Sequence, residues 1–577
     1  MTYTGSGAQI LVECLDRAGV RTIFGLPGDT GVALYDALYD AQDRMTHVLA
    51  RDERSAAMMA DAYARCSNRV GVVEASSGGG TTFLVGGLGE AYAASVPILV
   101  ITSDIHRSSR GTGALTEIDQ TALFSAVTKW AATVSSADQI PELLTEALTA
   151  ATTGRPAPVS LVFPEDVFDE VATVVLPERN EQRLPVALPR ERCEASTEAV
   201  ARAVQLLNDA SRPAIVAGSG VHISEAWDTL AKIVNQAGIP IATSIHGKGS
   251  IAEDSPWSLG VVGANGAREY ANEYLAGADV VLFIGTRANA TDTNSWRSPP
   301  REGPTIIGID IDESRAGRNF PDSFKLVGDA QTVLGQLLEH LAPNQDRAQQ
   351  LSGWIREPRE VWEAADRGDS ATDGAMLPYP ADVVRAARDA STGSDPIVIA
   401  DPGTATPNVA AYWELCKAGR SILVPRGHGP MGYAIPAAIG VAVAAPGRRV
   451  IAFTGDGSFA MSCGDLETAC RLALPITYVQ FTNGSMGWIK MLQYLYHERR
   501  YFGVDPGPSD ASLVAKGFGL RSTRVDSLET FREAFADFYS LDGPTFIDVR
   551  VPEEFEVVPP VAPWQRALAG EAGRPVY

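Results

Sequence analysis

The stretch 454–493, TGDGSFAMSCGDLETACRLALPITYVQFTNGSMGWIKMLQ, decides the fold of this chain. The apolar run RRVIAF before it predicts a strand, ITYVQF predicts a second strand, and a helix is expected between them. The strands end at GDG (455–457) and TNG (482–484). Neighbouring strands of a parallel sheet end at the same edge, where open α/β sheets bind ligands. Oxygens from Asp456 and Asn483, beside glycines and a helix N-terminus, would there suit a hard divalent cation holding a diphosphate.

This arrangement resembles the GDG…N signature of thiamine diphosphate (ThDP) enzymes, with 25 residues between Gly457 and Asn483. The resemblance implies that Mg²⁺ is bound by Asp456, Asn483 and the main-chain carbonyl of Ser485. Thr482 stands where the family usually has a first asparagine, which is not a ligand. A plain surface turn is the alternative, since DG dipeptides often mark turns, but the spacing and the β-α-β context favour the cofactor site. The other cofactor contacts expected here are Gly455, Gly457, Ser458, Met486 and Gly487.

Length and composition predict a large globular protein. The 577 residues predict three or four domains. The formal net charge of −22 argues against nucleic acid or an anionic membrane as the main partner. The sequence has no visible N-terminal signal segment and no apolar stretch of ~18 residues. The six cysteines are scattered without CxxC pairs, which favours reduced thiols in a cytoplasmic protein over a disulfide framework or a zinc site.

Residues 1–180 are predicted to form the first α/β domain, because helical patterns alternate with apolar, β-rich runs. The expected strands are VRTIFG, VGVVEA, VPILVITSD and PVSLVF, each followed by a polar, glycine-rich or proline-containing loop. HVLARDERSAAMMADAYAR places Glu53 at the start of a helix, directly after a strand. Taken alone, Glu53 would be interpreted as a first-turn acid that the helix dipole favours.

Three loops of this domain resemble, in the same order, those of acetolactate-synthase-type ThDP enzymes. FGLPGD, the segment around Glu53 and SSGGGTT fall where these proteins have FG(Y)PGG, their catalytic glutamate and TSGPG. The resemblance implies that Glu53 faces the pyrimidine ring of the cofactor, that Pro27 contacts the cofactor and that Gly28 lies near the substrate. Residues 1–180 are therefore interpreted as the pyrimidine-binding domain.

A proline- and charge-rich segment, 181–195, is predicted to link this domain to a second α/β domain at 196–342. Its expected strands are RPAIVA, IPIATSI, ADVVLFIG and PTIIGID. The GSG at 218–220 suggests dinucleotide binding, but Ile223 stands at the position of the third glycine. The corresponding domain binds FAD in some acetolactate synthases, and only Arg287 fits their RFDDR-like motif. We expect a structural spacer domain, with FAD as the less favoured alternative.

The third α/β domain is expected at 379–555, after a polar helical connection, 343–378, and before a tail, 556–577. Its segment GHGPMGYAIPAA resembles GLGTMGFGLPAA of the family. The resemblance implies that the carbonyl of Gly429 accepts the 4′-amino group of the cofactor and that Met431 separates its two rings. A methionine outside such a motif is usually a core residue.

ADPGTATP replaces the phosphate loop of the family, GQHQ, and leaves Thr404 as the expected phosphate contact. The chain is thus predicted to be α/β, with three doubly wound parallel-sheet domains: pyrimidine-binding, central and diphosphate-binding. A carboxyl at Glu53, in an apolar cleft that raises its pKa, is suited to donate to the pyrimidine nitrogen that activates the cofactor. The resemblance implies that the cofactor ylide adds to a 2-oxo acid, which is decarboxylated, and that the acyl carbanion passes to a second carbonyl.

The expected substrate positions depart from the family. Leu115 and Thr116 replace the Phe and Gln of its DAFQE segment, and Leu492 replaces the tryptophan that selects the acceptor in biosynthetic members. His428 takes a leucine position, either as an acid–base group for a different substrate or as a hydrogen-bonded structural histidine. Lys129, in a segment that resembles VTK of the family, completes the expected substrate residues.

These departures leave the reaction partner of the acyl carbanion open. An acetolactate-synthase-like carboligase is the main prediction, and a simple 2-oxo acid decarboxylase or another C–C lyase of the superfamily is the alternative. A non-catalytic scaffold or regulatory homologue is disfavoured because Glu53 and Asp456 are both present. A flavin- or nicotinamide-dependent oxidoreductase rests only on the incomplete glycine pattern. The family also implies a homodimer or homotetramer, in which the domain of Glu53 reaches the diphosphate domain of a neighbouring chain.

Overall fold

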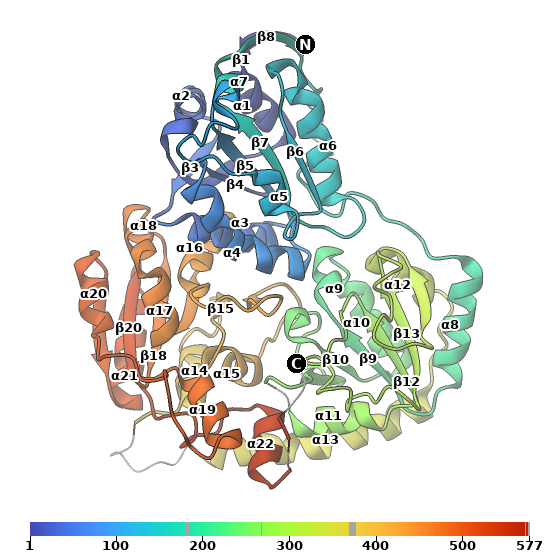
Figure 1. Cartoon of the computed structure of the whole chain (residues 1–577). Helices are drawn as coiled ribbons and strands as arrows, with labels where there is room; N and C mark the ends of the chain where they lie inside the picture. Colours follow the sequence, from blue (N-terminus) through green and yellow to red (C-terminus); the bar gives the residue numbers. More distant parts are fainter. Residues whose placement is uncertain (180–183, 267, 369–376, 572, 575–577) are drawn as a thin grey trace. The chain divides into compact units, whose positions relative to one another are not determined.

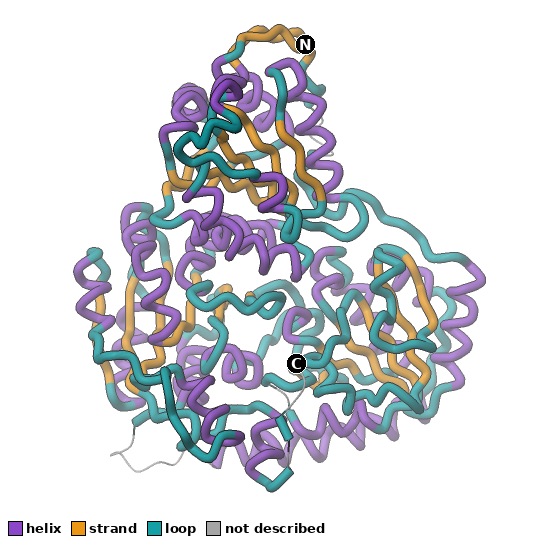
Figure 2. Tube along the Cα trace, viewed as in Figure 1, coloured by secondary structure: helices purple, strands orange, loops and turns teal. Residues whose placement is uncertain are grey.

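The computed structural model describes residues 1–179, 184–266, 268–368, 377–571 and 573–574 (Figure 1). The chain forms two compact units. The first consists of 1–191, 425–448 and 461–476, and the second of 192–424, 449–460 and 477–577. Figure 2 shows strands in orange and helices in purple. One six-stranded sheet belongs to the first unit and two belong to the second.

The sheet of the first unit is parallel, in the order β3-β2-β4-β5-β7-β6. Its middle strands β4 and β5 are buried along their whole length, as in a parallel sheet with both faces covered. An antiparallel pair, β1 and β8, lies outside this sheet. The strands are β1 (Thr2–Ser6), β2 (Thr22–Leu26), β3 (Thr46–Leu49), β4 (Gly71–Ala75), β5 (Ile98–Asp104), β6 (Trp130–Thr133), β7 (Val159–Pro164) and β8 (Val171–Val175).

The helices of the first unit start and stop at residues that the sequence marks. Ser6 and Gln9 form a capping box at the start of α1, and Gly19 ends this helix in the left-handed conformation. Helix α16, from the later segment of this unit, packs along α3. The helices are α1 (Gly7–Ala18), α2 (Val32–Asp40), α3 (Glu53–Ser67), α4 (Gly79–Ala94), α5 (Gln120–Phe124), α6 (Ile140–Thr152), α7 (Glu165–Asp169), α16 (Ala434–Ala444) and α18 (Leu466–Arg471), with 3-10 turns η1 (Asp29–Gly31), η2 (Arg107–Ser109), η3 (Ala137–Gln139) and η5 (Cys463–Asp465).

The first sheet of the second unit has the order β11-β10-β9-β12-β13-β14, which is the strand order of dinucleotide-binding folds. Its strands and the helices around them enclose one apolar core. The strands are β9 (Pro213–Ala217), β10 (Ile241–Thr243), β11 (Ser258–Val261), β12 (Val280–Ile284), β13 (Thr305–Asp310) and β14 (Phe324–Val327). The helices are α8 (Thr197–Asp209), α9 (Ser219–Ile223), α10 (Trp227–Ala237), η4 (Ile245–Gly247), α11 (Glu269–Ala276), α12 (Ala330–Leu338) and α13 (Gln345–Gly368).

The other sheet of the second unit has the order β16-β15-β17-β18-β20-β19 and its own apolar core. β17 and β18 are neighbours in it, as the opening stretch of the sequence predicts. The strands are β15 (Ile397–Ala400), β16 (Ile422–Leu423), β17 (Val450–Gly455), β18 (Ile476–Thr482), β19 (Arg521–Val525) and β20 (Thr545–Arg550). The helices are α14 (Pro380–Ala390), α15 (Ala405–Tyr412), α17 (Asp456–Ser462), α19 (Gly487–Tyr496), α20 (Ala511–Gly517), α21 (Leu528–Tyr539) and α22 (Ala562–Leu568).

The predicted fold class, α/β with three parallel-sheet domains, is confirmed. Two local predictions need correction. The strand expected to end near Thr404 ends at Ala400, because Pro402 and a left-handed Gly403 turn the chain before α15. The single helix expected between β17 and β18 is two short helices, α17 and α18, separated by a 3-10 turn. Residues 180–183 of the expected linker region and 369–376 of the expected connection lie outside the described residues.

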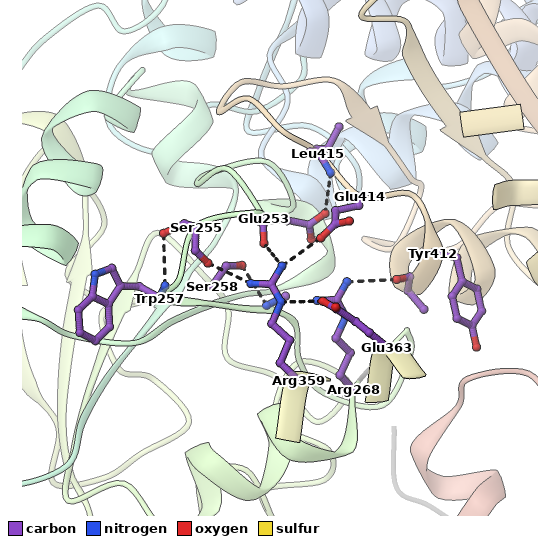
Figure 3. A network of polar contacts seen from close by, with 12 residues as sticks. Glu253, Ser255, Trp257, Ser258, Arg268, Arg359, Glu363, Tyr412, Glu414 and Leu415 are labelled. Carbon is purple, nitrogen blue, oxygen red and sulfur yellow. Dashed lines mark hydrogen bonds and ion pairs between the residues drawn. The ribbon is translucent and has the colours of Figure 1, made fainter. Parts of the chain in front are cut away.

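A polar network ties α13 to loops of both domains of the second unit (Figure 3). The guanidinium of Arg359 donates to the backbone carbonyls of Glu253 (2.9 Å) and Ser255 (3.1 Å) and pairs with Glu414 at 3.1 Å. The carboxylate of Glu253 also accepts the backbone N–H of Leu415 at 3.0 Å. A guanidinium offers several donors in a fixed plane, so one side chain holds three segments together.

In the described part of the chain, no helix combines the length and the apolar character needed to cross a bilayer. All six cysteines are free thiols, and all six belong to the described residues.

Candidate active site

The expected cation ligands lie in the loops that follow β17 and β18. Asp456 Oδ1 accepts the backbone N–H of Gly457 at 2.9 Å, and its Oδ2 accepts that of Gly484 at 2.8 Å. Burial raises the pKa of Asp456, while these backbone donors oppose the shift. Asn483 Oδ1 accepts the backbone N–H of Ser485 at 3.1 Å. The structure therefore brings the three expected ligands together at one edge of the sheet.

This set of donors fits a hard cation. Asp456 contributes a carboxylate, Asn483 an amide oxygen and Ser485 a carbonyl, and such all-oxygen sets suit Mg²⁺, which usually binds one or two carboxylates together with substrate phosphates. Within the described residues, no group of three or more His, Cys, Asp and Glu side chains could hold a metal ion. An added Cβ on Gly455 would meet no atom within 4 Å, so open space lies beside the turn.

The other expected contacts of this half-site lie around the same edge. Ser458 is buried in α17. The backbone N–H of Met486, at the start of α19, donates to the carbonyl of Val504 at 2.7 Å. Thr404 lies in the loop after β15. Leu492, expected near the substrate, packs on the apolar cluster of Met491, Val561 and Trp564.

A buried acid, Glu554, joins two of these loops. It follows β20, the neighbour of β18, and only 3% of it is exposed. The hydroxyl of Thr404 donates to its Oε1, and Asn483 Nδ2 donates to its Oε2 at 2.9 Å. Burial, with Glu553 and Asp456 nearby, raises the pKa of Glu554 to about 7. Glu554 is thus a further polar group of the half-site.

Glu53 occupies the first position of α3 in the first unit and is 8% exposed. The Asp52 side chain caps this helix by accepting the N–H of Arg54 at 2.8 Å. Burial raises the pKa of Glu53, and the charges of Asp52 and Glu74 add to the shift. An added Cβ on Gly80 would lie 2.8 Å from Glu53 Oε1, so the glycine-rich turn after β4 lies directly against this carboxyl. Burial thus shifts Glu53 toward its protonated form, which can donate a hydrogen bond.

Glu74, the acid that acts on Glu53 from β4, belongs to a buried polar group. The hydroxyl of Tyr35 donates to Glu74 Oε1, and His47 Nε2 lies 3.2 Å from the same oxygen. Tyr35 and His47 are themselves 3.0 Å apart, between the hydroxyl oxygen and Nε2. Glu74 is therefore fixed in place by residues of α2 and β3.

A second buried acid of this unit, Glu90, holds the loop expected to contact the cofactor. Its Oε1 accepts the backbone N–H of Gly427 at 3.0 Å, and its Oε2 accepts those of His428 at 2.6 Å and Gly429 at 3.1 Å. Arg65 pairs with Glu90 Oε1 at 2.9 Å. Three backbone donors on one carboxylate fix the path of the chain just before Met431, which is half-buried.

The expected substrate residues of the first unit separate into two places. Gly28 lies against Ser76, and Thr116 donates or accepts a hydrogen bond of 2.8 Å with Ser77, so both lie at the carboxyl ends of the strands. Leu115, beside Thr116, is 86% exposed. Lys129 lies at the amino end of β6, where its ammonium donates to the carbonyls of residues 153 and 155 at 2.7 and 3.0 Å. The structure does not bring Lys129 together with Gly28 and Thr116.

Two further expected contacts of the first unit lie in loops or beside helices. Pro27 is exposed in the loop after β2, and the His428 ring packs beside Gly89.

Three family profiles match the chain: the thiamine pyrophosphate enzyme N-terminal TPP binding domain at 5–123, the central domain at 200–337 and the C-terminal TPP binding domain at 401–549. The chain is 33% identical over 565 residues to the probable acetolactate synthase large subunit of Methanocaldococcus jannaschii, covering 97% of this chain and 94% of that protein. It is 30% identical to the acetolactate synthase large subunit of Lactococcus lactis (96% and 94% covered) and 29% identical to the mitochondrial acetolactate synthase catalytic subunit of Saccharomyces cerevisiae (96% and 82%).

The chain belongs to the thiamine pyrophosphate enzyme family. The predicted resemblance to acetolactate-synthase-like ThDP enzymes is confirmed, and with it the prediction that the chain is a ThDP-dependent enzyme of the carboligase and decarboxylase type.

In this thiamine pyrophosphate enzyme the glycine pair of the central domain has a packing reason. An added Cβ on Gly218 would lie 2.4 Å from the carbonyl oxygen of Gly285, and one on Gly220 would lie 2.6 Å from its Cα. The loops after β9 and β12 touch here, so the pair is explained without a bound dinucleotide. FAD binding to this domain stays a prediction, as the less favoured alternative.

Sequence reasoning missed the acids Glu74, Glu90 and Glu554. Glu554 had a detectable signal, because the pair Glu553-Glu554 comes soon after a strand, separated from it by Val551 and Pro552. Glu74 and Glu90 had none, since one lies inside an apolar strand and the other inside a small-residue helix.

Proposed function

We propose that this enzyme uses ThDP and Mg²⁺ to decarboxylate a 2-oxo acid and to transfer the resulting acyl carbanion to a second carbonyl compound. The observation that carries the proposal is the edge of the third sheet, where the side chains of Asp456 and Asn483 lie in neighbouring loops beside open space. The names of the relatives support the same class of reaction, since three of them are acetolactate synthases.

In this proposal Asp456, Asn483 and the carbonyl of Ser485 hold the cation, and Thr404 contacts the diphosphate. The backbone donors on Asp456 favour its ionised form, which binding of a cation requires. Bound ThDP supplies a carbon nucleophile for the 2-oxo acid and an electron sink for its decarboxylation. The remaining expected contacts, Gly455, Gly457, Ser458, Met486 and Gly487, line the same loops.

Glu53 acts on the pyrimidine side. Burial shifts its pKa upward, toward the protonated carboxyl that donates a hydrogen bond to the ring nitrogen. Glu90 fixes 427–429 by three backbone hydrogen bonds, so that the Gly429 carbonyl is pre-oriented as the acceptor for the amino group. Met431 follows on the same segment and is the proposed support for the bent cofactor.

We also propose that the enzyme is a cytoplasmic homodimer or homotetramer in which Glu53 of one chain and Asp456 of another serve one cofactor. The resemblance to the family supports this arrangement. A simple decarboxylase is the alternative, because Leu115, Thr116 and Leu492 replace the residues that the family uses for its substrates.

The test is carbon dioxide release from a panel of 2-oxo acids, pyruvate included, with and without ThDP and Mg²⁺. Each reaction is then analysed for hydroxyketone and aldehyde products. Cofactor-dependent release with a hydroxyketone product supports the carboligase, and an aldehyde alone supports the decarboxylase. The proposal fails if no 2-oxo acid is decarboxylated while ThDP is shown to be bound.

A further inference from the structure

Glu554 uses its two oxygens on two different loops of the proposed diphosphate half-site. Oε1 accepts the hydroxyl of Thr404, and Oε2 accepts Nδ2 of Asn483 at 2.9 Å. The carboxyl lies so close to α19 that an added Cβ on Gly487 would be 1.8 Å from Oε2. Only glycine fits at this position while Glu554 keeps its place, so this helix start is shaped around the acid.

The contact with Asn483 matters because the two ends of an asparagine amide have similar size and opposite chemistry. A cation is bound by the oxygen, and the NH₂ group would repel it. Both carboxyl oxygens of Glu554 accept hydrogen bonds here, Oε1 from Thr404 and Oε2 from Asn483, so Glu554 selects the orientation in which Nδ2 faces it. The backbone N–H of Ser485, 3.1 Å from Oδ1, agrees with the same orientation.

Glu553, the sequence neighbour of Glu554, has different partners. Glu553 accepts the hydroxyl of Ser485 at 2.6 Å and pairs with Lys490 at 2.5 Å. Its charge therefore has a cation beside it, whereas the two partners of Glu554 named above are neutral. Glu553 holds the loop and α19 together, while Glu554 acts on the amide of an expected metal ligand.

We propose that Glu554 is a positioning residue that keeps the amide oxygen of Asn483 directed to the Mg²⁺ site and links it to the phosphate-contacting Thr404. The inference rests on the proposed function, since it assigns Asn483 to the cation. Carboxylates that hydrogen-bond to the metal-binding side chains typically increase the affinity of the site for the metal by about 10- to 100-fold.

Glutamine is the informative replacement. Glu554 and Thr404 also line a cavity of about 400 Å³, so truncation to alanine would enlarge that cavity and mix two effects. Glu554→Gln keeps the shape, but the new amide accepts or donates and no longer selects one orientation of Asn483. We expect the dissociation constant of Mg²⁺, at saturating ThDP, to rise about 10- to 100-fold. Isothermal titration calorimetry of the full-length enzyme without substrate measures it.

Glu529→Gln, an exposed substitution of the same kind on α21, is the matched control and should leave Mg²⁺ affinity unchanged. Wild type that fails to bind ThDP with Mg²⁺ would overturn the proposed function itself. Wild-type binding with an equal Mg²⁺ affinity in Glu554→Gln would overturn only the inference.

The Asn483→Asp background distinguishes orientation of the Asn483 amide by Glu554 from a general structural effect of Glu554 on the loop. Both carboxylate oxygens of an aspartate are ligands, so no orientation needs to be selected, and Glu554 would instead repel the new charge. There, Glu554→Gln should leave Mg²⁺ affinity unchanged or increase it. A decrease as large as in the Asn483 background would contradict the positioning role. If Glu554→Gln alone does not fold, a loss of Mg²⁺ affinity when it is added to Asn483→Asp would still contradict the positioning role.

Discussion

The first and third sheets have the same strand order, and burial raises the pKa of the acid at each carboxyl edge, Glu53 or Asp456, but the groups around the two acids differ. Counted along each domain, both orders are 2-1-3-4-6-5. In the first, burial raises the pKa of Glu53, one backbone hydrogen bond opposes the shift, and the charges of Asp52 and Glu74 add to it. In the third, burial also raises the pKa of Asp456, and the backbone N–H groups of two adjoining turns oppose the shift. The topology decides where polar residues gather, and the local donors and charges adjust how far burial shifts each pKa.

The loops of the two domains are also held in different ways. Glu90 binds three backbone N–H groups, so its hold on 427–429 does not depend on the side chains there. Glu554 binds the side chains of Thr404 and Asn483, so its hold depends on what those residues are. The first arrangement fixes the path of the backbone, and the second fixes two particular side chains.

The largest effect is expected from removing the carboxylate of Asp456 at the edge of the third sheet. Asp456→Asn keeps the size of the side chain but offers one neutral oxygen, and its NH₂ cannot accept the backbone N–H of Gly484. We expect Mg²⁺-dependent binding of ThDP to weaken by more than about 100-fold, since replacing a ligand costs at least as much as replacing its support. Calorimetric titration with ThDP and Mg²⁺ measures this. Binding within a few-fold of wild type would remove Asp456 from the cation site.

The second-largest effect is expected from replacing Glu53, the acid at the edge of the first sheet. Glu53→Gln cannot transfer a proton, so turnover should fall by about 10²- to 10⁴-fold, the usual contribution of general acid–base catalysis. ThDP binding should stay close to that of wild type, because Glu53 is not among the cation ligands. Steady-state kinetics and the same titration give both numbers. Full turnover in Glu53→Gln would contradict the proposed mechanism.

A third substitution tests the backbone-held loop. Glu90→Gln leaves one oxygen and an NH₂ group for three N–H donors and removes one acidic partner of Arg65, while Asp61 remains. Hydrogen bonds to charged groups contribute about 1.5–3 kcal/mol, so the amides of 427–429 should exchange with solvent about tenfold faster or more. Hydrogen–deuterium exchange by mass spectrometry measures this. Glu146→Gln, exposed on α6, is the control and should change nothing in this loop. Unchanged protection in Glu90→Gln would show that the loop holds its path without the carboxylate.

The sequence predicts the edge residues of both sheets for one reason. Glu53, Asp456 and Asn483 each come within a few residues of the end of an apolar run, and the end of a strand is the feature that periodicity marks best. The role of Glu90 could not be predicted, because its carboxylate binds a loop that lies 337 residues further along the chain. Lys129 shows the opposite failure: the motif is matched, but the position at the amino end of β6 separates it from Thr116.

The smallest effect is expected from removing the charge of Glu74, which lies near Glu53 in the first sheet. Glu74→Gln removes a negative charge that raises the pKa of Glu53, while Asp52 remains on the same side. Because Glu53 must be protonated to donate, activity is lost as the pH rises through its pKa. Lowering that pKa moves the descending limb of the kcat profile to lower pH and leaves the acidic plateau in place. Tyr35 and His47 can still hydrogen-bond to the new amide, so the fold is retained.

The kcat–pH profiles of wild type, Glu74→Gln and Glu146→Gln measure this shift. Only Glu74→Gln should move the limb, because Glu146 is exposed on α6, away from the edge. A limb that stays in place would mean that burial alone keeps Glu53 protonated. A limb that moves to higher pH would contradict the assignment of Glu74 as a charge that raises the pKa of Glu53. In the third sheet the backbone N–H groups of Gly457 and Gly484 lower the pKa of Asp456 by more than the nearby charge of Asp548 raises it, and that is the physical difference between the two edges.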